Sequence, residues 1–247
     1  MTATTLGYAF LGGLLPSLIW LYFLLREDAR HPEPKLLVSF AFVTGMIAVP
    51  LALPLEQWAC TRLAIDPFLA CALQARGLDT IISWALIEEV LKYIMAAAFI
   101  LWRRAVDETP DYVIYMITVA LGFASAENML FLVAPLSEGQ LAMSVFTGDL
   151  RFLGSTLLHV IASAAIGLAF AFSAKFRPLA RAIAAALGVI LAITLHTAFN
   201  MLIIKQGTST ALVAFFLVWM VAVIFFAAFE VLKYFQYRNF PNNTYSQ

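Results

Sequence analysis

The sequence has 247 residues, of which 63% are hydrophobic and 12% are charged, and its mean hydropathy is +0.90. This composition is typical of integral membrane proteins and excludes an ordinary soluble globular domain. The 15 basic and 15 acidic residues cancel, which argues against nucleic acid as a partner. No polar stretch is long enough to form a soluble domain, so we expect residues 1–247 to form a single domain embedded in the lipid bilayer.

Seven apolar segments are long enough to cross a bilayer, which requires a helix of about 20 residues. The first has no basic residues before it and no small-residue cleavage site, so we expect a retained span and not a cleaved signal peptide. The sequence predicts an all-α bundle of about seven transmembrane helices. The predicted spans are 5–25, 36–58, 78–102, 111–134, 151–174, 180–204 and 209–232.

Lysine and arginine residues in the loops predict the orientation of the chain. Ten lie on one side of the predicted spans and four on the other, and the side with more of them faces the cytoplasm in most membrane proteins. We interpret Arg151, one of the four, as an interfacial anchor. The N-terminus is therefore expected outside the membrane and the C-terminus in the cytoplasm.

The segment 59–77 joins the second and third spans but is too interrupted by polar residues to cross the bilayer. We expect it to lie on the outer interface as an amphipathic segment. It contains the only two cysteines, Cys60 and Cys71, which could form a disulfide in an oxidising compartment. Two unpaired cysteines in apolar surroundings are the interpretation that we favour.

Four of the predicted spans contain ionisable or amide side chains, which we take as candidate site residues. An ionised group near the middle of a transmembrane helix costs about 2.5–3.5 kcal/mol, so these side chains should face one another and not lipid. The candidates are Glu88, Glu89 and Lys92 in 78–102, Glu127 and Asn128 in 111–134, His159 in 151–174, and His196 and Asn200 in 180–204.

The predicted depths of four candidates are similar. Because a helix rises about 1.5 Å per residue, Glu88, Glu127, His159 and His196 all come out about 10–15 Å below the outer surface. Four polar groups on four helices would then share one layer of the membrane. This coincidence predicts a common polar pocket.

The spacing of Glu88, Glu89 and Lys92 indicates different roles for the two glutamates. Lys92 follows Glu88 by four residues and Glu89 by three, so it can approach either carboxylate. Adjacent helical side chains point about 100° apart. We therefore expect one glutamate to face the pocket and the other to form a structural ion pair with Lys92, but the spacing does not say which.

Carboxylate, imidazole and amide groups in one pocket suit peptide hydrolysis. A carboxylate can take a proton from water, imidazoles can hold that water or a metal, and an amide such as Asn128 or Asn200 can support the substrate or the oxyanion. Two histidines and a carboxylate also suit a divalent metal such as zinc. The sequence has no compact HExxH motif, so the metal stays an open question.

Four motifs lie in order on separate apolar spans: "EEVLK" (88–92), "FASAENMLF" (123–131), "RFLGSTLLHVIASAAIG" (151–167) and "HTAFN" (196–200). Together with "REDARHPEPKLL" (26–37) they resemble the PrsW family of bacterial intramembrane proteases, within the wider CAAX-protease and bacteriocin-processing superfamily. The resemblance extends over about residues 20–205.

The resemblance implies that Glu88 or Glu89 activates water and that Glu127, His159 and His196 complete the catalytic centre. It also implies a membrane-anchored protein substrate, which in the best-known member is an anti-sigma factor. CAAX-type relatives have EExxxR, with arginine one position after Lys92, and a histidine in place of Glu127, so their mechanism does not transfer. The family has been discussed both as metalloproteases and as glutamate-activated hydrolases.

An intramembrane endopeptidase is thus the main hypothesis. A proton- or ion-coupled transporter would also bury carboxylates and histidines within the membrane, but we find no inverted repeat and no pair of broken helices in the sequence. A third alternative is a scaffold or sensor without enzymatic activity that binds other membrane helices.

Overall fold

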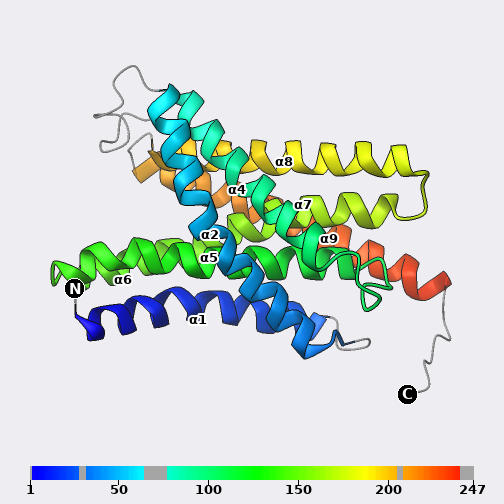
Figure 1. Ribbon diagram of the computed structural model, residues 1–247, viewed down its shortest axis with the longest axis horizontal. Helices are drawn as coiled ribbons and strands as arrows, with labels where there is room; N and C mark the ends of the chain where they lie inside the picture. The colour runs from blue at the N-terminus through cyan, green and yellow to red at the C-terminus, as the bar shows by residue number, and fades with distance from the viewer. Residues whose placement is uncertain (1, 28–31, 64–76, 205–207, 240–247) are drawn as a thin grey trace.

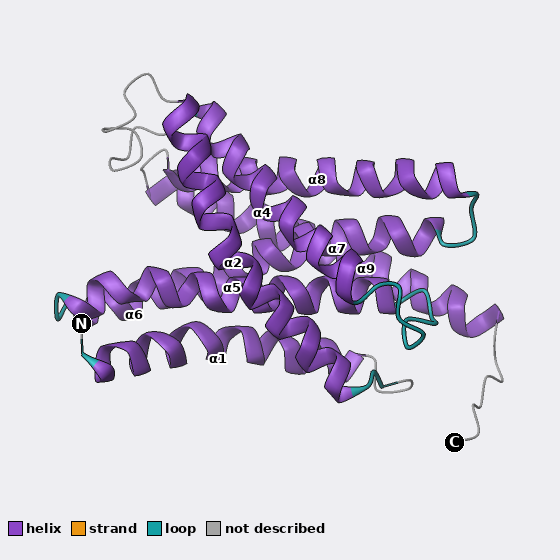
Figure 2. Cartoon of the chain, in the orientation of Figure 1, coloured by secondary structure: helices purple, strands orange, loops and turns teal. Residues whose placement is uncertain are grey.

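The computed structural model describes residues 2–27, 32–63, 77–204 and 208–239, and these residues form helices and connecting loops without any strand (Figures 1 and 2). The predicted all-α, polytopic bundle is confirmed. The helices are α1 (Ala3–Glu27), α2 (Lys35–Leu63), α4 (Leu78–Phe99), α5 (Asp111–Ser137), α6 (Leu141–Leu150), the π-helical turn η1 (Arg151–Ser155), α7 (Thr156–Ser173), α8 (Pro178–Ile204) and α9 (Thr208–Asn239).

Successive long helices run in alternating directions, and the start of α1 and the end of α9 lie at opposite ends of the bundle (Figure 1). α1, α5, α7 and α8 lie roughly along the long axis, whereas α2 and α4 cross them together as a steeply inclined pair. This arrangement brings α4, α5, α7 and α8 together in the middle of the molecule.

Six helical segments of the described chain are long and apolar enough to cross a membrane: Ala3–Glu27, Lys35–Arg62, Asp111–Ser137, Leu141–Ser173, Pro178–Ile203 and Thr210–Gln236. They correspond to six of the seven predicted spans. The remaining one is α4, which has 22 residues but carries Asp79, Glu88, Glu89 and Lys92. Its glutamates and lysine are buried, so α4 directs its charges into the bundle and not toward lipid.

The fifth predicted span differs most from the structure. We expected it to begin at residue 151, but helix already forms at Leu141 and continues as α6, η1 and α7 to Ser173. The short turn after α5 contains Gly139, whose φ of 72° is a left-handed conformation that glycine adopts without a steric penalty. The fifth membrane segment is therefore longer than predicted and contains a π-helical turn.

α2 and α5 are in backbone contact at two glycines. A Cβ atom added to Gly122 would lie 1.9 Å from the carbonyl oxygen of Phe42, and one added to Gly45 would lie 1.9 Å from that of Val119. Small residues allow membrane helices to approach closely and to gain van der Waals contact. These contacts fix α5 against α2 a short distance before Glu127.

We expect Gly122→Leu to destabilise the protein strongly, because the backbone of α2 leaves no room for a side chain. The apparent melting temperature in detergent should fall by several degrees, in line with a typical overpacking cost of about 1–3 kcal/mol or more. Gly7→Leu is the matched control, since nothing lies within 4 Å of a Cβ at Gly7. Equal melting temperatures for both variants would contradict the tight α2–α5 contact.

The connection between α2 and α4 is only partly described. Residues 59–63, which we expected to lie on the interface, are the last residues of α2. Residues 64–76 of that segment, including Cys71, lie outside the described residues. Cys60 is buried and bonded in a disulfide, so the expectation of unpaired cysteines is wrong for Cys60.

Candidate active site

Four helices bring the predicted polar residues into one cluster inside the bundle. Glu88, Glu89 and Lys92 come from α4, Glu127 and Asn128 from α5, His159 from α7 and His196 from α8. All of these side chains are buried except that of Glu127, which is 20% exposed.

Glu89 and Lys92 form a completely buried ion pair within the cluster. Lys92 Nζ donates to Glu89 Oε1 at 2.6 Å, and both side chains are completely buried. The same ammonium lies 3.0 Å from His159 Nδ1 and 4.8 Å from the ring centroid of Phe123. Glu89 Oε1 lies 2.7 Å from His196 Nδ1. The Glu89–Lys92 pair therefore holds the Nδ1 atoms of both imidazoles.

These partners assign the protons of the two rings. An ammonium can only donate, so His159 Nδ1 accepts from Lys92, and His159 carries its hydrogen on Nε2. That Nε2 donates to Glu127 Oε2 at 3.0 Å. His196 donates from Nδ1 to the carboxylate of Glu89, which leaves Nε2 of a neutral His196 as an acceptor. The Nε2 atoms of both rings thus face the other two carboxylates, Glu88 and Glu127.

Glu88 differs from Glu89 in having no cationic partner at hydrogen-bond distance. Its Oε2 is buried without a hydrogen-bond partner in the described chain and lies 3.9 Å from His196 Nε2. A buried carboxylate oxygen without a partner is costly and points to a missing water, ion or substrate group. The structure thus separates the two adjacent glutamates: Lys92 binds Glu89, and Glu88 faces the imidazoles.

Glu127 and Asn128 are held by an arginine. Arg151 donates from Nη2 to Glu127 Oε2, and from Nε to Asn128 Oδ1 at 2.5 Å. Asn128 donates in turn to Thr156 Oγ1 at 3.0 Å. The guanidinium also lies 3.9 Å from the ring centroid of Phe131. The amide of Asn128 is therefore occupied within the protein, which leaves it little capacity to bind a substrate.

Arg151 is the residue that reasoning from sequence missed, because we interpreted it as an interfacial anchor. It precedes His159 by eight residues, and in a straight α-helix this spacing would separate the two by about 80°. The π-helical turn η1 accommodates one extra residue. The spacing then corresponds to seven α-helical residues, which places Arg151 and His159 about 20° apart around the helix axis. The one signal in the sequence was the charge count: the candidate site has three carboxylates and a single lysine, so a second cation was needed.

Asn200 lies one turn after His196 on α8 and is half-buried. Its side chain makes no hydrogen bond to the residues that the structure describes. The amide is therefore available to a bound molecule, in contrast to that of Asn128.

Glu88, His159 and His196 also form a group that could hold a metal ion, since one ligand atom from each lies within 4.8 Å of the others. Two histidines and one glutamate are the protein ligands of several catalytic zinc sites, which keep a further position open. Glu88 Oε2 and His196 Nε2 have no competing hydrogen bond, and His159 Nε2 would exchange its bond to Glu127 for the ion. The unpartnered oxygen of Glu88 fits such a ligand set.

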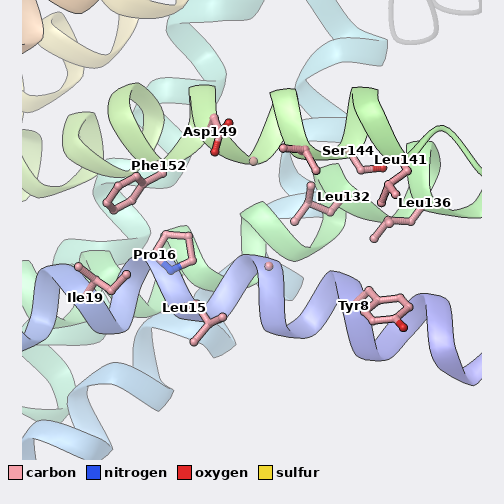
Figure 3. A pocket seen from close by; sticks show the side chains of 13 residues that line it. Tyr8, Leu15, Pro16, Ile19, Leu132, Leu136, Leu141, Ser144, Asp149 and Phe152 are labelled. Carbon is pink, nitrogen blue, oxygen red and sulfur yellow. The ribbon is translucent and has the colours of Figure 1, made fainter.

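A surface groove elsewhere on the bundle has a different character. It has a volume of about 420 Å³ and lies between α1, α5 and α6, where Pro16, Leu132, Ser144, Asp149 and Phe152 are among the lining residues (Figure 3). None of the candidate site residues lines it. The groove is largely apolar and lacks the paired carboxylates and imidazoles of the buried cluster.

Comparisons with known proteins identify the family of the chain. Residues 33–229 match the model of a family described as "PrsW family intramembrane metalloprotease". The chain is 28% identical over 165 residues to Protease PrsW of Geobacillus kaustophilus, which is 66% of this chain and 65% of that protein. It is 23% identical over 217 residues to Protease PrsW of Shouchella clausii, which is 86% of this chain and 93% of that protein.

The chain thus spans about 65% of the length of the Geobacillus protein, and no solved structure matches it. The family match covers well over half of the chain. It includes all of α4, α5, α7 and α8 and most of α9. It contains every residue of the buried polar cluster. The chain therefore belongs to the PrsW family of intramembrane metalloproteases.

Proposed function

We propose that the chain is an intramembrane endopeptidase in which Glu88 activates the attacking water. The observation that carries this proposal is the buried Oε2 of Glu88, which has no hydrogen-bond partner in the described chain and lies 3.9 Å from His196 Nε2. A water between these two atoms would hydrogen-bond to both. Glu89 and Glu127 are less suited to the task because Lys92 and Arg151 neutralise them.

In this mechanism Glu88 takes a proton from the water while the water oxygen bonds to the carbonyl carbon of the scissile peptide. The C–N bond then breaks, and Glu88 returns the proton to the leaving amine. His196 Nε2 orients the water, and His159 Nε2–H faces the same space. The free amide of Asn200 is the group that we propose for stabilising the oxyanion.

A divalent metal such as zinc would be held by Glu88, His159 and His196, and activation of the water would then fall to the metal and not to Glu88. When bound, it would lower the pKa of a water molecule and polarise the scissile carbonyl. The hydrogen bond from His196 Nδ1 to Glu89 supports this ligand set, because metal-binding histidines commonly donate their second ring N–H to a carboxylate. His159 would bind the ion through Nε2 only with its hydrogen on Nδ1, which would reverse its hydrogen bond with Lys92.

The substrate that we propose is a membrane-anchored protein, and an anti-sigma factor is the class that the family resemblance favours. Residues 1–247 would act as one membrane-embedded protease domain. We also propose that the N-terminus lies outside and the C-terminus in the cytoplasm. The disulfide at Cys60 supports this orientation, which places that end of α2 on the oxidising side.

Metal analysis tests the proposed ligand set. The purified protein should contain about one zinc or similar ion per chain, and a strong chelator should abolish cleavage of a membrane-anchored substrate until metal is returned. His196→Ala should lose most of the metal, whereas Asn200→Ala should keep it and lose only activity. Full activity in a protein free of metal would refute the metal-dependent mechanism and would leave Glu88 as the proposed base.

A further inference from the structure

Arg151 is connected to His159 through one side chain, Glu127. It donates to Glu127 Oε2, and the same oxygen accepts from His159 Nε2 at 3.0 Å. A second branch runs from Arg151 through Asn128 to Thr156. The two branches connect α5 to Arg151, the first residue of the π-helical turn, and to Thr156, the residue directly after it.

The π-helical turn determines where Arg151 points. The backbone N–H of Thr156 bonds to the carbonyl oxygen of Arg151, five residues earlier, as a π-helix requires. Without this turn Arg151 would rotate away from the face of α7 that carries His159. Gly154 allows the turn to pack closely against α9, because a Cβ atom there would lie 2.1 Å from the ring of Phe215.

Arginine suits this place better than lysine. Its planar fork binds two acceptors in fixed directions, and here those acceptors are the neighbouring side chains Glu127 and Asn128. The two groups are partly open to solvent, with Arg151 13% and Glu127 20% exposed. Arg151 thus closes the cluster on its more exposed side, opposite the buried Glu89–Lys92 pair.

We propose that Arg151 is a positioning residue for proteolysis, which fixes the carboxylate of Glu127 and through it the ring of His159, and that the π-helical turn is the element that aims it. This inference rests on the proposed function. Loss of Arg151 would leave Glu127 as a carboxylate without a cation, close to Glu88, and free to adopt other rotamers. The ring of His159 would then lose one of its two fixed hydrogen bonds.

Kinetics of the full-length protein in lipid vesicles test the role in the reaction. Arg151→Gln should lower kcat about 10–100-fold, as expected for a group that orients a catalytic histidine, with little change in KM. Arg151→Lys should recover part of kcat, because lysine can pair with Glu127 but cannot also bind Asn128 in the same geometry. Unchanged kcat in Arg151→Gln would overturn the proposal.

A double-mutant cycle tests whether Arg151 acts through Glu127. The ¹⁵N signals of the His159 ring in the metal-free purified protein report the hydrogen bond at Nε2, and they should shift in Arg151→Gln and in Glu127→Gln. The double variant should show about the same shift as Glu127→Gln alone. Additive shifts would show that Arg151 does not act through Glu127. This readout does not depend on cleavage, so it separates failure of this inference from failure of the proposed function.

Deletion of Leu153 tests the π-helical turn itself. Leu153 lies in the turn and is 46% exposed, so its removal should restore α-helical register at little packing cost. Arg151 would then precede His159 by seven residues, a spacing that keeps the two within about 20° of each other in a straight α-helix. The deletion should therefore keep the kcat and the His159 ring signals of the wild type, as should Leu153→Ala. A deletion variant with the defects of Arg151→Gln would refute the role of the turn, and if it does not fold, the Arg151 variants still decide the proposal.

Discussion

Replacing Glu88 with glutamine is expected to reduce cleavage of a membrane-anchored substrate by about 10²–10⁴-fold, the usual contribution of a general base. Glutamine has nearly the same shape as glutamate but cannot accept a proton from water. Because Glu88 Oε2 makes no hydrogen bond to the described residues, the substitution removes no contact that stabilises the fold. The variant should therefore keep the melting temperature of the wild type while losing activity.

Glu138→Gln is the control for this change, since Glu138 is exposed in the turn between α5 and α6. It should cleave at the wild-type rate. A Glu88→Gln variant that also cleaves at the wild-type rate would rule out Glu88 as the base.

Breaking the Glu89–Lys92 pair should instead cost stability. Removal of one member of a buried ion pair leaves an uncompensated charge and typically costs about 3–5 kcal/mol. Lys92→Met should therefore unfold at markedly lower denaturant concentration than the wild type. The double variant Glu89→Gln/Lys92→Met should recover part of that loss, because neither charge is left alone.

A second ion pair in the same chain provides the matched control. Glu230 and Lys233 have the same spacing of three residues and the same 2.6 Å separation, but Glu230 is 46% exposed. Glu230→Gln should cost less than about 1 kcal/mol, because exposed pairs contribute little. If chemical unfolding gave equal losses for Lys92→Met and Glu230→Gln, the buried pair would not have the structural role that we assign to it.

Several features of the fold could be predicted because they follow from the bilayer. Apolar length sets the number of spans, and the cost of charge in lipid requires polar side chains to meet. The estimate of common depth for Glu88, Glu127, His159 and His196 depended only on helical rise. Their contacts in the structure agree with that estimate.

Other features depend on contacts that spacing does not encode. Lys92 can reach Glu88 or Glu89 from its own helix, and the structure pairs it with Glu89, whose Oε1 also binds His196 from α8. The role of Arg151 depends on one extra residue in a helical turn, and no residue pattern that we recognise marks such a turn. The disulfide at Cys60 depends on the compartment as much as on the sequence.

Hydrolysis by the purified protein tests the central claim most directly. A single-span protein substrate would be incubated in lipid vesicles with wild-type protein in water enriched in ¹⁸O, and the products analysed by mass spectrometry. We predict one major cleavage site within or next to the membrane span, with ¹⁸O in the new C-terminal carboxylate. The Glu88→Gln variant should release no detectable product. Intact substrate after incubation with folded, metal-supplied protein, or cleavage that persists in Glu88→Gln, would contradict the account.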